Sequence, residues 1–347
     1  MSNDVFFLGA GFSRAIDSSY PTLKELSVHV QKKMKTDEKG SVREHYDHEI
    51  PAQLKNNVEA LLSYLSADLP WKTGTQKYEN LALYEKIIEY IQSYFLGKHI
   101  ASAQEIKDIQ QGIILPDFGL TDEKNAAIFY KFILKNNLDK NRKDIITLNY
   151  DLMSEVFLNK YKLHQTSIRN DDLYQIPIPY TETRSGSGSF THYGMPHTPH
   201  LIKLHGSINW YWSGRSPTDT IFCHENFSKE QDILGLRPCI VPPVMDKTQF
   251  YDHVVLRGLW EIAERKLRNA DNIYIIGFSF PPTDLSVRFL FQSALRNKSS
   301  QIYVVNTDTS KGLKRTYNEV LGKLDIDYTY CCKNAFARFV NERLKNV

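Results

Sequence analysis

Val5-Phe6-Phe7-Leu8-Gly9-Ala10-Gly11-Phe12-Ser13-Arg14 is the stretch that decides the fold. An apolar run, typical of a buried strand, passes directly into two glycines that are one residue apart. Glycines at the carboxyl end of a strand let the backbone turn sharply. They also let its N–H groups approach a pyrophosphate at the N-terminus of the next helix. Glycine pairs occur in ordinary turns too, but this position favours a nucleotide-binding loop.

The loop departs from the dehydrogenase fingerprint. That fingerprint requires a third glycine where Arg14 stands, and an acidic residue after a second strand about 20 residues later, which is also missing. The sequence therefore argues against the usual hydride-transfer arrangement.

Further apolar runs with the character of buried parallel strands follow along the chain. They are Asp144–Leu148, Leu201–Leu204, Cys239–Val241, Asn272–Ile276, Gln301–Val305 and Asp325–Tyr330. Helical patterns over Ala126–Leu134, Val254–Leu267 and Leu285–Leu295 separate several of them. Alternating strands and helices predict an α/β fold, a Rossmann-like doubly wound parallel sheet.

The first two predicted strands lie about 130 residues apart, far more than a crossover needs. Thr22–Val30, Asn57–Leu65 and Glu79–Tyr94 space their apolar residues at three and four, which predicts helices. We therefore expect one domain, with a Rossmann-like core at 1–21 and 140–347 and a mainly helical insertion at 22–139. The Gly- and Ser-rich stretch 179–200 is expected to be a loop.

Composition excludes several classes of protein. The 347 residues are 41% hydrophobic and 24% charged, as in ordinary globular proteins. Lys and Arg number 43 against 40 Asp and Glu, so direct nucleic-acid binding is not indicated. Four scattered cysteines without a CxxC predict no disulfide framework. The N-terminus lacks a signal-peptide pattern, and no apolar run suits a membrane span, so we expect a cytoplasmic protein.

Polar motifs recur where later strands are predicted to end. They are Thr147-Leu148-Asn149-Tyr150-Asp151, His205-Gly206-Ser207, Gly277-Phe278-Ser279 and Asn306. With Gly-Ala-Gly-Phe-Ser at residues 9–13 and the nearby Pro21, this series resembles the sirtuin superfamily, and more specifically the bacterial SIR2-like proteins. The motifs follow the same order as in that superfamily, and each lies at the end of a predicted strand, over about 300 residues.

The resemblance implies NAD as substrate, with Asn149 and His205 as the catalytic pair. An amide can orient a water or the ribose hydroxyls, and a histidine can take a proton near neutral pH. The residues expected to bind NAD are Gly9, Ala10, Gly11, Phe12, Ser13, Asp151, Gly206, Gly277, Phe278, Ser279 and Asn306.

Structural roles compete with these functional ones. Asn149 would also suit the cap of a helix starting near residue 152, Asp151 fits a cap or a ribose contact, and a lone histidine such as His205 is often structural. His192, His197 and His200 are expected to lie in a solvated loop, and no metal is expected. Trp210 and Trp212 suit either the core or a wall of the nicotinamide side.

The chain lacks the two CxxC pairs that hold zinc in deacylase sirtuins, which puts deacylation in doubt. The resemblance instead points to bacterial SIR2-like defence effectors and to NAD hydrolysis, giving nicotinamide and ADP-ribose. It further implies a homo-oligomer and a regulatory partner such as a HerA-like ATPase. The alternatives are an NAD or ADP-ribose sensor without turnover, and a deacylase or ADP-ribosyltransferase.

Overall fold

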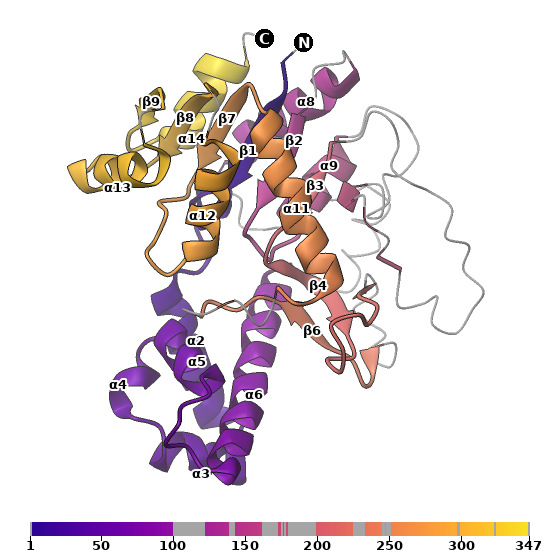
Figure 1. Ribbon diagram of the computed structural model, residues 1–347, viewed down its shortest axis with the longest axis vertical. Helices are drawn as coiled ribbons and strands as arrows, with labels where there is room; N and C mark the ends of the chain where they lie inside the picture. The colour runs from indigo at the N-terminus through magenta and orange to yellow at the C-terminus, as the bar shows by residue number, and fades with distance from the viewer. Residues whose placement is uncertain are drawn as a thin grey trace.

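The computed structural model describes residues 2–99, 122–138, 143–161, 173–174, 176, 178–179, 199–224, 233–244, 247, 251–296, 299–322 and 324–345. Six strands form one parallel sheet in the order β3-β2-β1-β7-β8-β9 (Figure 1). These strands are β1 (Asp4–Leu8), β2 (Lys143–Thr147), β3 (Leu201–Lys203), β7 (Asn272–Ile276), β8 (Gln301–Asn306) and β9 (Ile326–Cys331). The predicted doubly wound α/β fold is confirmed.

Helices cover both faces of the sheet, because successive strand residues point to opposite sides. Phe6 of β1 packs on Phe129 of α8, whereas Phe7 packs on Phe291 of α12. The flanking helices are α8 (Glu123–Leu138), α9 (Met153–Lys160), α11 (Val254–Asn269), α12 (Leu285–Ala294), α13 (Lys311–Leu321) and α14 (Ala335–Phe339), followed by the π-helical turn η4 (Val340–Leu344). Alternating apolar residues of the strands thus pack on both layers of helices, within one continuous hydrophobic core.

One predicted strand was assigned to the wrong sheet. The run 239–241 falls in β6 (Arg237–Ile240), which pairs antiparallel with β4 (Gly206–Trp212). With β5 (Phe222–Cys223), these strands form a separate sheet of order β5-β4-β6. An apolar run shows that a strand is buried but carries no information on the direction of its partner, so the sequence pattern could not assign it.

A helical lobe follows the first βα turn, as predicted (Figure 1). After α1 (Ala10–Ile16) it contains α2 (Leu23–Thr36), α3 (Ser41–His48), α4 (Ala52–Lys55), α5 (Val58–Ser66) and α6 (Gly74–His99). Helix α2 starts at a capping box, in which the Thr22 side chain accepts from the Glu25 N–H and Glu25 accepts from the Thr22 N–H. Helix α8 lies within the predicted insertion range, yet its Phe129 packs on the sheet.

Helix α6 connects the lobe to the rest of the molecule. The Nε2 of its buried Gln92 donates to the Ile208 carbonyl and to the Tyr211 hydroxyl, both at 2.7 Å, and both residues belong to β4. Further along α6, Phe95 packs on Tyr150, with ring centroids 5.9 Å apart. The end of α6 thus lies against the loop that follows β2.

The two tryptophans of β4 differ in burial, and of the histidines in the stretch 179–200 the structure describes one. Trp210 is buried against Tyr174 in the core, whereas Trp212 is only partly buried. Most of the stretch 179–200, with His192 and His197, lies outside the described residues, but His200 is buried, so its assignment to a solvated loop was wrong.

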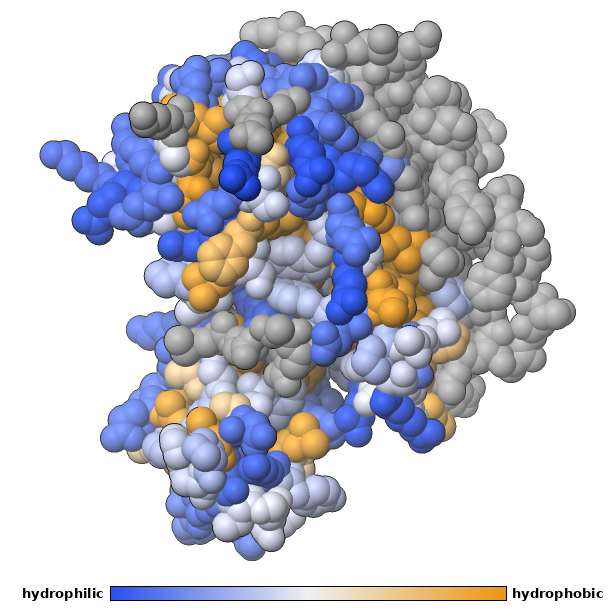
Figure 2. All heavy atoms as spheres, viewed as in Figure 1, coloured by the Kyte–Doolittle hydropathy of each residue, from blue (hydrophilic) through white to orange (hydrophobic). Residues whose placement is uncertain are grey.

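The four cysteines are free thiols. Among the described helices, none is long and apolar enough to span a membrane. In Figure 2 polar side chains dominate the visible surface, and apolar ones form small patches, several of them on the helical lobe. The large apolar side chains exposed on that lobe are Leu23, Val28, Trp71, Tyr78 and Leu81.

Candidate active site

The strand register aligns the predicted motifs along one edge of the sheet. Leu8, the last residue of β1, pairs with Thr147 of β2 and with Ile276 of β7, and Ile276 pairs with Val305 of β8. Gly9, Gly277 and Asn306 therefore directly follow paired positions. The chain proceeds from β1 outward to β3 and later from β7 outward to β9, so β1 and β7 flank the topological switch point, where open α/β sheets bind ligands.

Glycines at the switch point bring two loops into backbone contact. The N–H of Gly9 donates to the Ile276 carbonyl, and that of Gly11 donates to the Gly277 carbonyl, both at 2.9 Å. A Cβ on Gly9 would lie 2.6 Å from the Gly277 oxygen. These two N–H groups, expected from the sequence to approach a pyrophosphate, instead donate within the protein. Ala10 and Gly11 remain exposed at the start of α1.

Gly277→Ala should separate the two loops. Gly277 has φ of +67°, and a Cβ there would lie 2.2 Å from the Phe12 nitrogen. We expect a loss of about 1–3 kcal/mol in unfolding free energy, since the left-handed backbone alone is strained for alanine. Urea denaturation would measure it. Gly40 also has a positive φ (+74°) but open space around it, so Gly40→Ala should cost less; equal losses would show that the loop contact contributes nothing.

The side chain of Asn149 is fixed through its amide nitrogen. Nδ2 donates to the Gly9 carbonyl (3.0 Å) and to Oγ of Ser13 (2.8 Å). Both N–H donors are thereby used, and Oδ1 remains as an acceptor. These bonds reach back to the glycine loop, so the first turn of α9 is not what orients Asn149. The half-buried amide instead offers an oxygen to an O–H group.

Ser13 and Asp151 continue this chain of hydrogen bonds. Oγ of Ser13 donates to Oδ2 of Asp151 (2.9 Å), and Oδ1 of Asp151 accepts from the N–H of Met153 (2.9 Å), the first residue of α9. Both Ser13 and Asp151 are buried. The structure places them behind Asn149, where they orient its amide, and Asp151 also satisfies an N–H at the start of the helix.

Lys203 supports the loop after β2 through hydrogen bonds to its backbone, a role that the sequence did not predict. It is 1% exposed, and its Nζ donates to the carbonyls of Asp151 (2.5 Å) and Tyr150 (3.4 Å) and to Oε1 of Glu155 (2.8 Å). Oε1 of Glu155 also accepts from the Tyr174 hydroxyl (2.8 Å). The sequence does contain a signal for this role, since Lys203 stands inside the apolar run 201–204. A lysine in a buried strand must have polar partners, which indicates a buried ion pair.

Thr147 of β2 pairs with Lys203 of β3. Asn149 and His205 each lie two residues beyond this pair, so they occupy equivalent positions after the two strands. The imidazole is 5% exposed, and its buried Nε2 has no hydrogen-bond partner in the described part of the chain. Its ring lies 6.4 Å from the rings of both Tyr150 and Trp260. Burial, and then the charge of Lys247, hold the pKa of His205 well below 6.5. The imidazole is therefore neutral at physiological pH, and its pKa is lower than the sequence suggested.

The other predicted site residues mainly shape the loops. Phe12 packs on Phe129 in the core. The carbonyl of the buried Phe278 accepts from Nδ2 of Asn306 (3.0 Å), which ties the ends of β7 and β8 together. Ser279 is exposed. Gly206 has φ of +75°, and a Cβ on it would lie 2.1 Å from the Cys239 oxygen.

Asn149 and His205 therefore stand at equivalent positions after neighbouring strands. Asn149 has an amide oxygen that accepts no hydrogen bond from the described residues, and His205 has a neutral ring nitrogen. This pair can accept hydrogen bonds and one proton. In the described ranges, no cluster of three or more His, Cys, Asp or Glu side chains could hold a metal ion.

No protein-family model matches the chain, and no curated protein sequence matches it either. Solved structures that resemble it include a Sir2 homologue in complex with NAD, with 15% identity and a TM-score of 0.47 over 99% of this chain and 91% of that chain. A Sir2 homologue mutant in complex with ADP-ribose has 14% identity and a TM-score of 0.46 over 98% and 91%. A Sir2 enzyme has 12% identity and a TM-score of 0.41 over 100% and 94%.

Proposed function

We propose that the chain binds NAD at the carboxyl edge of the sheet and hydrolyses its N-glycosidic bond, releasing nicotinamide and ADP-ribose. The observation that carries the proposal is the fixed amide of Asn149, which follows β2, beside the neutral imidazole of His205, which follows the neighbouring β3 and whose Nε2 has no hydrogen-bond partner among the described residues. The sequence resemblance to SIR2-like proteins supplies the identity of the substrate.

The cleavage needs only modest catalysis, because the nicotinamide of NAD is a cationic ring that leaves as a neutral molecule. The C–N bond breaks with its electron pair moving to the nicotinamide nitrogen, through an oxocarbenium-like transition state. Oδ1 of Asn149 accepts an O–H from water or from the ribose and so orients it. As the water oxygen bonds to the anomeric carbon, its proton passes to Nε2 of His205.

Chromatography of NAD incubated with the purified protein tests this proposal directly. We expect nicotinamide and ADP-ribose to appear in equal amounts as NAD disappears. Tight NAD binding in calorimetry without product would favour the alternative, a sensor of NAD or ADP-ribose. Label from NAD appearing on protein would favour ADP-ribosyl transfer, and consumption of an acyl-lysine peptide would favour deacylation.

Turnover should remain constant as the pH falls from about 8 to 6.5 and decline only below that range. Protonation removes the base form of His205, and a pKa held below 6.5 moves that loss to more acidic pH. The dependence of kcat/KM on pH measures this decline, which is the acid limb of the profile. A limb at or above pH 6.5 would contradict the assignment of His205 as the base.

Lys247→Met should move the acid limb to higher pH, because the positive charge of Lys247 is the second cause that lowers the pKa of His205. The substitution also breaks the ion pair between Lys247 and Asp284. Lys33→Met, on α2 and paired with Asp37, serves as the control and should leave the limb unchanged.

The biological role that we propose is depletion of NAD in an infected cell, with the activity held in check by assembly. The resemblance to bacterial SIR2-like effectors supports this role, together with a homo-oligomer and a regulatory partner such as a HerA-like ATPase. Light scattering of the protein alone, and NAD turnover before and after adding the product of a neighbouring ATPase gene, would test the assembly and the partner separately.

A further inference from the structure

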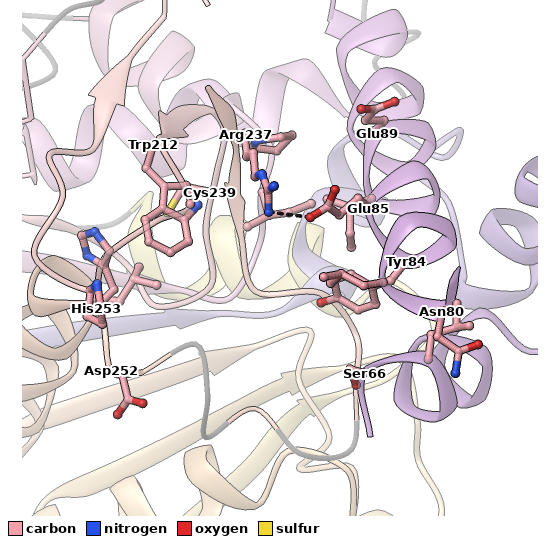
Figure 3. A pocket seen from close by; sticks show the side chains of 18 of the residues that line it. Ser66, Asn80, Tyr84, Glu85, Glu89, Trp212, Arg237, Cys239, Asp252 and His253 are labelled. Atoms are coloured by element: carbon pink, nitrogen blue, oxygen red, sulfur yellow. Dashed lines mark ion pairs between the residues drawn. The ribbon is translucent and has the colours of Figure 1, made fainter. Parts of the chain in front are cut away.

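A cavity of about 610 Å³ lies between the helical lobe and the antiparallel sheet (Figure 3). Neither Asn149 nor His205 lines it. Its volume lies within the range of about 300–1,000 Å³ that is usual for small-molecule sites. Helices α5 and α6 form one wall, and β4, β6 and the start of α11 form the other. It is therefore a second concave site, separate from the edge of the parallel sheet.

The walls combine apolar side chains with charged ones, and they include one hydroxyl that has no partner among the described residues. Leu65 and Ile88 on the helical wall and Ile240 and Leu256 on the other wall line the cavity, and Trp212 adds an indole surface. The hydroxyl of Tyr84 is buried and has no hydrogen-bond partner within the described residues. Figure 3 shows Tyr84 on α6 with this hydroxyl directed toward the β4–β6 side. Such an atom calls for an acceptor, which none of the described residues provides.

The charges at the cavity disfavour an anionic ligand. Its lining holds two cations among the described residues, Lys77 and Arg237. Lys77 pairs with Asp68 at 2.5 Å, and Arg237 pairs with Glu85 at 2.5 Å, as the dashed line in Figure 3 shows. Two further carboxylates also line the cavity. A phosphate would therefore meet cations that are already neutralised, whereas a neutral or cationic ligand would meet no such barrier.

Strand β6 leads from this cavity to the candidate active site. Cys239 and Ile240 line the cavity, and the next residue, Val241, bonds to both sides of the site. Its N–H donates to the His205 carbonyl (2.8 Å), and its carbonyl accepts from the Tyr150 hydroxyl (2.7 Å). A shift of β6 would therefore reach His205 and the Asn149 loop together.

We propose that this cavity binds a flat aromatic molecule, neutral or cationic, whose hydrogen-bond acceptor meets the Tyr84 hydroxyl, and that β6 transmits its occupancy to the NAD edge. The first half stands independently of the proposed function, and the second half rests on it. Coupling of this kind is reciprocal, so NAD should change the affinity of the second ligand as much as that ligand changes the affinity of NAD.

The naphthalene ketone prodan is a suitable probe, because it is neutral, flat and carries one carbonyl acceptor, and its emission shifts to the blue in apolar surroundings. We expect saturable binding to the full chain, and weaker binding of the related sulfonate 1-anilinonaphthalene-8-sulfonate. Tyr84→Phe should weaken prodan about fivefold through loss of the hydrogen bond. Ser66→Trp should fill the cavity and abolish binding, whereas Ser41→Trp, on the exposed start of α3, should leave it intact.

Each half of the proposal has an outcome that overturns it. Absence of a saturable blue shift, or equal prodan affinity in Ser66→Trp and the wild type, overturns the binding site. Stronger binding of the sulfonate overturns the choice of ligand charge. Unchanged NAD affinity in calorimetry at saturating prodan overturns the coupling, and this readout holds even if NAD is never cleaved, which would contradict only the proposed function.

Discussion

His205→Ala and Asn149→Ala are each expected to lower NAD cleavage by about 10²–10⁴-fold, the range typical for loss of a positioned acid–base group. His205→Ala removes Nε2, the neutral nitrogen that we assign as proton acceptor. Asn149→Ala removes Oδ1, together with the two bonds that its amide makes to Gly9 and Ser13. The first variant should act mainly on kcat, whereas the second should also raise KM, because it releases the glycine loop.

Single-turnover and steady-state rates of NAD loss would measure both effects, with far-UV circular dichroism and thermal melting to show that each variant is folded. His48→Ala, at the exposed end of α3 in the helical lobe, is the matched histidine control and should retain full turnover. Full turnover in both folded site variants would refute the catalytic assignment. Loss of turnover in the control as well would point to a general defect of the preparation.

The parallel sheet was predictable because its strands are short apolar runs separated by helical patterns, and all six helices predicted from those patterns overlap observed helices of the flanks or the lobe. The antiparallel sheet was not, because β4 starts at Gly206, directly after His205, and its pairing with β6 depends on residues about 30 positions away. Local patterns contain no information about such partners.

The site was predictable at the level of strand ends but not of hydrogen bonds. Asn149 and His205 could be placed after neighbouring strands from sequence order alone. Their protonation and orientation depend on residues from other elements, namely Gly9 and Ser13 for the amide and Lys247 for the imidazole. Asp151 shows the same limit, since the sequence left its role open between a cap and a ligand, and the structure gives it a bond to Ser13 as well as one to the helix start.

Lys203→Met is expected to lower the free energy of unfolding by about 3–5 kcal/mol, the usual cost of removing one partner from a buried ion pair. The ammonium is 1% exposed, and its loss would leave the buried carboxylate of Glu155 with the Tyr174 hydroxyl as its hydrogen-bond donor. Denaturant unfolding would measure the loss at neutral pH, where that carboxylate must remain charged or take up a proton at a cost.

The double variant Lys203→Met/Glu155→Gln separates the charge from the support that Lys203 gives to the loop. Glutamine removes the unpaired charge, so part of the stability should return. The carbonyls of Tyr150 and Asp151 would still lack their donor, and Asn149 stands next to them in the same loop. We therefore expect NAD turnover to fall in Lys203→Met and to stay equally low in the double variant, even where stability recovers. Equal recovery of stability and turnover would make Lys203 a purely structural residue. The control is Lys160→Met, which breaks the more exposed ion pair with Glu123. It should change the free energy of unfolding by no more than about 1 kcal/mol and turnover by no more than about twofold.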